Sequence, residues 1–244
     1  MAIFIQPFVL LINIALFKSI YAYNKVQYIN GYSLEQMIWY FTVVGFVQAF
    51  MVNFVDTRIS SKVLSGELTI DLLRPMSVFR FELGNAIALR TIGVLMEFVP
   101  GIVLYSMIFA PKFLTVYSVL RFIPAAMLSF LLFYLINFLL GLTSFIIKNN
   151  SSLANLKFVV IWGLGGGFIP LEFYSEPINN IISFLPFKYM FFWPIQIYLN
   201  REPAGNIEFY LKIISIQLLW ALVLYFFCRL LWNKAVNKFC SAGG

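Results

Sequence analysis

Histidine is absent from this chain of 244 residues, and only two cysteines, Cys228 and Cys240, are present. The missing imidazole excludes histidine-based metal ligation and histidine acid–base catalysis. The two cysteines are too far apart for a C-x-x-C motif and do not lie among carboxylates, which favours free thiols over a disulfide. We therefore expect neither a metal site nor a catalytic residue in this chain.

Charged residues are also scarce. They make up 11% of the chain, whereas 61% of the residues are hydrophobic; an ordinary soluble domain has about 25% charged residues. A soluble domain of this size needs a polar shell, and a lipid bilayer removes that requirement. The sequence therefore predicts an all-α, polytopic membrane protein with one transmembrane domain over residues 1–244.

The formal net charge of +7 raises nucleic acid as a partner. However, the lysines and arginines are scattered between apolar runs and form no cluster. They are better explained as charges that set topology near anionic lipid headgroups. We expect the lipid bilayer, and no nucleic acid, as a partner.

Six apolar stretches are long enough to cross a hydrocarbon core, which takes about 20 helical residues. Lipid offers backbone groups no hydrogen-bonding partners, so these stretches are expected to be helices. The first stretch lacks the basic start and the cleavage site of a signal peptide, which favours a span. The predicted spans cover residues 2–21, 36–55, 85–110, 120–147, 153–171 and 207–232.

Lysine and arginine near the ends of the spans predict that both termini are cytoplasmic. With this orientation, ten of the 17 basic residues lie inside and seven lie outside. Residues 56–84 then form a cytoplasmic segment and residues 172–206 an external one. We expect a multi-pass protein of a cell membrane, most simply a bacterial plasma membrane.

The cytoplasmic segment begins with a compact amphipathic element over residues 56–75. Val55, Ile59 and Val63 share one helical face, and Gly66 interrupts the helix. Two interpretations stay open: an interfacial helix that anchors the loop in headgroups, or a docking and coupling element for a cytoplasmic partner. The candidate coupling residues are Asp56, Arg58, Ile59, Lys62, Val63, Gly66, Glu67, Leu72, Leu73, Arg74 and Pro75.

Glu97 is the sole carboxylate deep inside a predicted span. Intramembrane charge is costly and usually faces protein or water, so Glu97 is either a substrate-path residue or a hydrogen-bonded group at a helix contact. Pro100 is expected to loosen the local helix.

The external segment mixes prolines with aromatic residues, and its apolar part is too short to cross the membrane. We expect short re-entrant or interfacial helices that cap the external mouth, or a simple interfacial aromatic mat. The candidate substrate-path or gate residues are Glu97, Pro170, Pro186 and Phe187.

Motifs in chain order carry a family resemblance. Residues 65–67 read SGE and residues 72–75 read LLRP; residues 169–171 read IPL, residues 185–187 read LPF, and the chain ends in GG. This order resembles type-2 ATP-binding-cassette (ABC) permeases, in the subgroup with an SG(D/E)…LLRP first cytoplasmic loop. Such permeases usually have an amphipathic elbow helix before the first span, which this sequence lacks or has lost.

The resemblance implies the permease subunit of an ATP-driven exporter, in which two permease chains, identical or related, pair with two nucleotide-binding ATPase subunits. This chain has no GxxxxGK(S/T) loop, since the glycine-rich residues 163–167 lack the lysine and the hydroxyl. ATP and Mg²⁺ are therefore expected on the partner ATPase, with no cofactor and no enzyme activity on this chain. The implied mechanism is alternating access, with an amphipathic drug, lipid or peptide as substrate.

Three readings from other classes are a secondary transporter, a membrane-embedded enzyme and a structural subunit of a membrane complex. The first two usually need several intramembrane ionisable groups, and Glu97 stands nearly alone.

Overall fold

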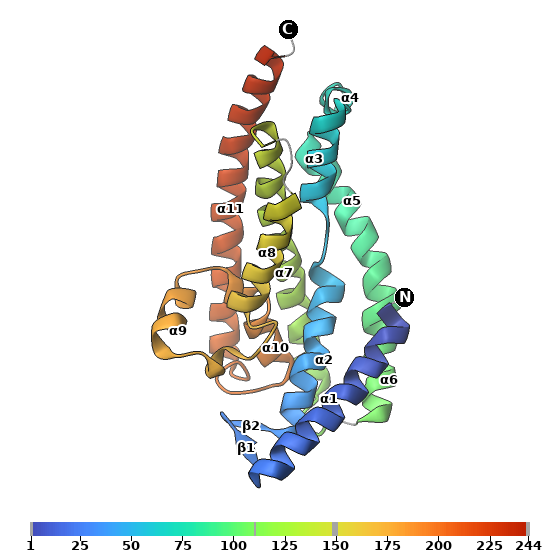
Figure 1. The fold of residues 1–244 in the computed structure, drawn as a ribbon, viewed down its shortest axis with the longest axis vertical. Coiled ribbons are helices and arrows are strands. Elements are labelled where there is room, and N and C mark those ends of the chain that lie inside the picture. The colour runs from blue at the N-terminus through green and yellow to red at the C-terminus, as the bar shows by residue number, and fades with distance from the viewer. Residues whose placement is uncertain (1, 110, 148–150, 243–244) are drawn as a thin grey trace.

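The computed structural model describes residues 2–109, 111–147 and 151–242 and shows a bundle of helices with one small β-hairpin (Figure 1). The hairpin pairs β1 (Tyr28–Ile29) with β2 (Tyr32–Ser33) in antiparallel register. The all-α prediction is thus confirmed for the described residues. The helices are α1 (Ala2–Asn24), α2 (Leu34–Met51), α3 (Val55–Ser65), α4 (Leu68–Leu72), α5 (Val78–Gly93), the π-helix η1 (Val94–Phe98), α6 (Val99–Ile108), α7 (Val116–Leu142), α8 (Ser151–Gly165), α9 (Glu176–Ser183), α10 (Phe192–Tyr198) and α11 (Ile207–Ala242), with 3₁₀ turns η2 (Thr143–Phe145), η3 (Leu171–Phe173) and η4 (Phe187–Tyr189).

Four helical rods among the described residues are long and apolar enough to cross a membrane: Leu34–Ser65, Val78–Ile108, Val116–Phe145 and Ile207–Val236. Shorter apolar helices cover Phe8–Asn24 and Ser152–Gly165. These helices follow the order of the six predicted spans, and four of them have the required length. The count of six spans stays a prediction.

The fifth predicted span, residues 153–171, is helical for less of its length than expected. α8 ends at Gly165, inside the glycine run, and the backbone of Gly166 adopts a φ of 86°. Glycine takes this left-handed conformation without steric cost. The chain therefore turns here, and α8 keeps 15 residues, fewer than the about 20 that span a hydrocarbon core.

The core of the bundle lies between α2, α7 and the short helix α10. In the most apolar parts of the rods, 72% of the residues are buried in Leu34–Ser65 and 61% in Val116–Phe145. Trp39 stacks on Tyr198 with ring centroids 6.2 Å apart, and Phe122 meets the same tyrosine edge-on at 5.3 Å. These aromatic contacts fix α10 against both central helices.

The outer helices expose most of their apolar surface. In the rod Val78–Ile108 only 11% of the most apolar residues are buried, and in Ile207–Val236 only 22%. A helix that is apolar all round needs a nonpolar environment. These faces therefore contact lipid or another membrane chain.

The rod Leu34–Ser65 is broken between α2 and α3, at residues 52–54. Asn137 of α7 donates hydrogen bonds to the backbone oxygen of Asn53 at 2.9 Å and to its Oδ1 at 2.8 Å. These bonds satisfy polar groups that the interrupted helix leaves open. The break is therefore a fixed bend held by the central helix α7.

The two ends of the bundle differ (Figure 1). α4 and the last turns of α11 lie at one end, and the hairpin lies at the other. This agrees with the prediction that residues 56–75 and the end of the last span share one side of the membrane. The predicted Gly243-Gly244 motif lies outside the described residues, as does the Cys240 side chain; Cys228 is buried, and its thiol donates to the Leu135 carbonyl oxygen at 3.5 Å.

Candidate functional site

The apolar face of α3 packs inside the chain. Val55 and Ile59 are fully buried, and a Cβ atom placed on Gly141 of α7 would lie 2.9 Å from the Ile59 Cβ. Only glycine permits so close a helix contact at this position. The hypothesis that Val55, Ile59 and Val63 face a partner therefore differs from the structure, which uses this face, with Val63 half-buried, against α7.

The exposed apolar residues of this region lie farther along, around α4. Gly66 ends α3 with a φ of 79°, as the predicted interruption required. Next to this turn, Leu64, Ile70 and Leu73 are 56%, 60% and 86% exposed. We call these three side chains the α4 tip. Glu67, Arg74 and Pro75 of the predicted coupling set are exposed around it, and Leu72 is half-buried.

An ion cluster ties α3 and α4 to the start of α5. Glu82 of α5 is fully buried and accepts from Arg58 Nε at 2.9 Å and from Lys62 Nζ at 2.7 Å. Lys62 also binds the Asp71 carboxylate of α4 at 2.6 Å, and Arg74 lies 3.4 Å from the same residue. Buried charges are tolerated only when they are paired and hydrogen-bonded in this way. The cluster thus joins three helices near the end of the bundle.

Sequence reasoning selected Arg58, Lys62 and Arg74 but missed Asp71 and Glu82. The signal for Glu82 was an acidic residue between Phe81 and Leu83, just before a predicted span. An acid in such an apolar setting needs a basic partner.

A second buried ion pair fixes the start of α3. Lys157 of α8 is 7% exposed and lies 2.6 Å from the carboxylate of Asp56, which is fully buried. The same ammonium group donates to Asn137 Oδ1 at 2.8 Å. α3, α7 and α8 therefore meet at one polar point next to the bend in the rod Leu34–Ser65. Asp56 is one of the predicted coupling residues, whereas Lys157 is not among the predicted site residues.

Glu97 occupies η1, in the middle of the rod Val78–Ile108, where it is half-buried. Among the described residues it has no hydrogen-bond or ion-pair partner. The π-helix directly precedes Pro100, whose missing N–H disturbs the regular bonding pattern. The π-helix is therefore the local loosening of the helix that the sequence predicts near Pro100. The substrate-path role of Glu97 stays a prediction.

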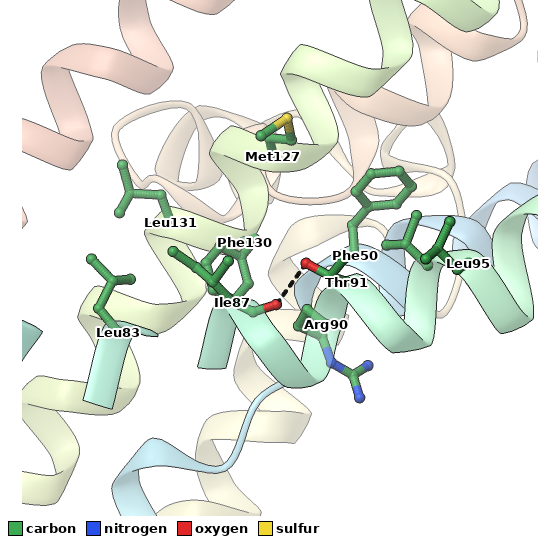
Figure 2. Close-up of a pocket in the computed structure, with 10 residues that line it drawn as sticks. Phe50, Leu83, Ile87, Arg90, Thr91, Leu95, Met127, Phe130 and Leu131 are labelled. Atoms are coloured by element: carbon green, nitrogen blue, oxygen red, sulfur yellow. Dashed lines mark hydrogen bonds between the residues drawn. The ribbon is translucent and has the colours of Figure 1, made fainter. Parts of the chain in front are cut away.

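A cavity of about 390 Å³ lies between α2, α5, η1 and α7 (Figure 2). Its one charged lining residue is Arg90, and Figure 2 shows the guanidinium pointing away from Met127 and Leu131. The Thr91 hydroxyl donates to the Ile87 carbonyl oxygen at 2.9 Å. The cavity is therefore apolar and suits a hydrocarbon group. Its lining is Phe50, Leu83, Ile87, Arg90, Thr91, Val94, Leu95, Met127, Phe130 and Leu131.

The other predicted gate residues lie away from Glu97, in the segment between α8 and α11. Pro170 and Pro186 are buried and Phe187 is half-buried. A Cβ atom on Gly165 would lie 3.0 Å from the Phe187 carbonyl oxygen, so η4 packs closely on the end of α8. The short helices predicted for this segment are present as α9 and α10, and α10 enters the core.

A polar cluster joins this segment to the hairpin. The Tyr32 hydroxyl lies 3.0 Å from Glu172 Oε1, and Arg201 pairs with Glu172 at 3.3 Å while its guanidinium lies 3.5 Å from the Tyr32 ring centroid. Partial burial raises the pKa of Glu172, whereas its bond to Tyr32 and the charge of Arg201 oppose that rise. The cluster closes the hairpin end of the bundle.

The fold and these sites define a multi-pass helical membrane protein with a polar-fastened element at one end. The sequence model of the ABC-2 family transporter protein family matches residues 9–243, and the chain belongs to this family. It is therefore the membrane permease component of an ABC transporter, which works with an ATP-binding subunit. Neither the curated proteins nor the solved structures gave a significant match.

Proposed function

We propose that this chain exports an amphipathic substrate across a cell membrane by alternating access, as one of two permease chains driven by two ATP-hydrolysing partner subunits. ATP and Mg²⁺ bind on the partners. The end of the bundle with α4 and the end of α11 faces the cytoplasm, and the hairpin end faces outside.

The observation that carries this proposal is the ion cluster behind the α4 tip. The tip offers three exposed apolar side chains to a partner. Behind it, Glu82 of α5 pairs with Arg58 and Lys62 of α3, the helix that leads to the tip. A displacement applied to α4 is passed to the membrane helices and not absorbed by a loose loop. This is the property that coupling to ATP hydrolysis requires.

Docking at the α4 tip follows the usual anatomy of such contacts. Apolar anchors such as Leu73 would enter a groove of the ATPase, with charged residues such as Glu67 and Arg74 at the rim. The buried residues Asp56 and Ile59 support the element from inside. In this proposal, Asp56 and Ile59 serve coupling by supporting the element and do not contact the ATPase.

The substrate class follows from the apolar surfaces. The cavity between α2, α5 and α7 is almost wholly nonpolar, and the outer faces of α5–α6 and α11 need lipid or a second permease chain to cover them. A drug, lipid or peptide with a large apolar part fits such a path.

The test is co-purification of the ATPase subunit with the detergent-extracted permease. Leu73→Asp places a charge on the most exposed anchor and should cost about 1–4 kcal/mol of binding, so the recovered ATPase falls at least fivefold. Tyr28→Asp is the matched control, because Tyr28 is also exposed but lies on the hairpin at the other end. Full ATPase recovery in Leu73→Asp would refute docking at the α4 tip.

Transport direction needs a separate measurement. In inside-out vesicles that carry the whole transporter, ATP should drive an apolar fluorescent substrate into the lumen. Movement of the substrate out of these vesicles would refute export.

A further inference from the structure

A second cleft, of about 410 Å³, opens at the α4 end of the bundle, between the start of α5, α7 and α11. Its floor consists of four aromatic rings. Phe79 lies 5.0 Å from Phe138 and 5.5 Å from Tyr225, and Phe138 lies 5.7 Å from Trp232, all measured between ring centroids. These rings form an apolar side of the cleft, and its lining also includes Ser77, Cys228 and Asn233.

Two arginines, Arg80 and Arg229, stand at the rim of this cleft. Both are exposed, and among the described residues neither guanidinium has a hydrogen-bond or ion-pair partner. By contrast, Arg58 pairs with Glu82, and Arg121 donates to the Gly205 carbonyl oxygen at 2.7 Å. The cleft therefore holds two guanidinium groups whose donors are free to bind an anion.

The backbone adds to this positive field. Ser77 lines the cleft and caps the first turn of α5, accepting from the Arg80 N–H at 3.4 Å. That turn carries no acidic side chain, so the positive end of the helix dipole is not neutralised there. The arginines and the helix end thus favour the same kind of ligand.

The cleft lies at the level where lipid headgroups are expected. Arg229 and Trp232 belong to the last turns of the rod Ile207–Val236, and Ser77 immediately precedes the rod Val78–Ile108. Tryptophan, tyrosine and arginine at the ends of spans are typical of the membrane interface. A ligand here has one part in the headgroup layer and another against the aromatic floor.

We propose that this cleft binds an anionic phospholipid of the leaflet on the α4 side. Its phosphate lies between Arg80 and Arg229, and its glycerol backbone lies on the aromatic rings. A soluble anion would use the arginines but would leave the aromatic floor uncovered. The assignment of this leaflet to the cytoplasmic side rests on the topology of the proposed function, whereas lipid binding to the cleft does not depend on it.

Native mass spectrometry of the purified chain tests the proposal, with phosphatidylglycerol as the anionic probe and phosphatidylcholine as the neutral one. The wild type should bind phosphatidylglycerol at least tenfold more tightly than phosphatidylcholine. The double variant Arg80→Gln, Arg229→Gln should lose at least tenfold in affinity for phosphatidylglycerol and bind both lipids about equally. Both side chains are exposed, so the variant should fold normally.

The matched control is Lys234→Gln, which removes a positive charge from an exposed residue of the same helix that does not line the cleft. It should change phosphatidylglycerol affinity by less than twofold. An equal loss in the control and in the double variant would show a general charge effect and overturn the site.

Inorganic phosphate distinguishes a lipid from a free anion. At millimolar concentration it should not displace bound phosphatidylglycerol. Displacement, or an equal rise in thermal stability from phosphate alone, would make the cleft a soluble-anion site and overturn the lipid proposal. A wild type with no preference between the two lipids would overturn it as well.

Discussion

Glu82 and Glu97 lie in the same rod, Val78–Ile108, yet their surroundings are opposite. Glu82 is fully buried near the α4 end of the bundle and pairs with Arg58 and Lys62. Glu97 lies half-buried in the π-helix near the middle and has no ion-pair or hydrogen-bond partner among the described residues. The difference shows that pairing, and not depth in the membrane alone, separates a structural carboxylate from one that is free to act.

The two acids therefore have different expected roles, Glu82 in fixing helices and Glu97 in transport. A buried acid with two basic partners fixes helices relative to one another, and removing a partner leaves an uncompensated charge. Glu97 makes no ion pair or hydrogen bond among the described residues, so its substitution breaks no contact that fixes one helix against another. Substitutions should therefore separate effects on stability from effects on transport.

The largest effect is expected where a buried carboxylate loses the one basic partner that it has in the described part of the chain. Lys157→Met leaves the fully buried Asp56 without its ammonium group and should lower the free energy of unfolding by about 3–5 kcal/mol. Thermal unfolding in detergent measures this change. Lys234→Met, at an exposed position, is the control and should stay within about 0.5 kcal/mol. Equal stability of the two variants would contradict the role of pairing.

Glu82→Gln should have a smaller but clear effect. It removes the charge that holds Arg58 and Lys62, and these side chains remain 31% and 20% exposed, so water compensates part of the loss. We expect a loss of about 2–3 kcal/mol and ATP hydrolysis that no longer depends on substrate. Unchanged coupling in a destabilised variant would limit the ion cluster to a structural role.

Glu97→Gln should leave stability within about 0.5 kcal/mol of the wild type. If Glu97 lies on the substrate path, the variant should instead change the transport rate at least twofold in vesicles. Glu97→Leu sharpens the test, since it also removes the polar group. Normal transport in both variants would remove Glu97 from the predicted path.

The smallest effect concerns a carboxylate that lies between these extremes. Burial raises the pKa of Glu172 above its ordinary 4.5, so the folded protein holds this proton more strongly than the unfolded chain. Stability from this group should therefore fall as pH rises from about 4.5 through the raised pKa. The Glu172→Gln variant should lack this slope in thermal unfolding between pH 4 and 7. A slope of opposite sign would mean that the pair with Arg201 dominates.

The sequence predicted features that depend on neighbouring residues. Apolar runs located the long helices, Gly66 marked the end of α3, and the SGE and LLRP motifs with their companions pointed to the type-2 ABC permeases, a family that the family match confirms. Each of these signals is local, or depends only on order along the chain.

Features that depend on distant partners could not be predicted in the same way. Lys157 meets Asp56 across 101 positions, and Ile59 meets Gly141 across a similar separation. An amphipathic pattern shows that a face is apolar but not what covers it. Both interpretations of the apolar face of α3, as a headgroup anchor or as a docking face, place it outside the chain, whereas α7 covers it.

The bend at residues 52–54 divides the rod Leu34–Ser65 into two segments, α2 and α3, and Asn137 fixes the joint between them. A continuous helix would act as one lever, and a push at α4 would tilt α2 and the aromatic core with it. Under the proposed docking at the α4 tip, a push on α4 would instead pass through the Glu82 ion pairs to α5 and through the Asp56–Lys157 pair to α8. The movement would then reach α5 and α8, which lie beside α3, while α2 stays in place.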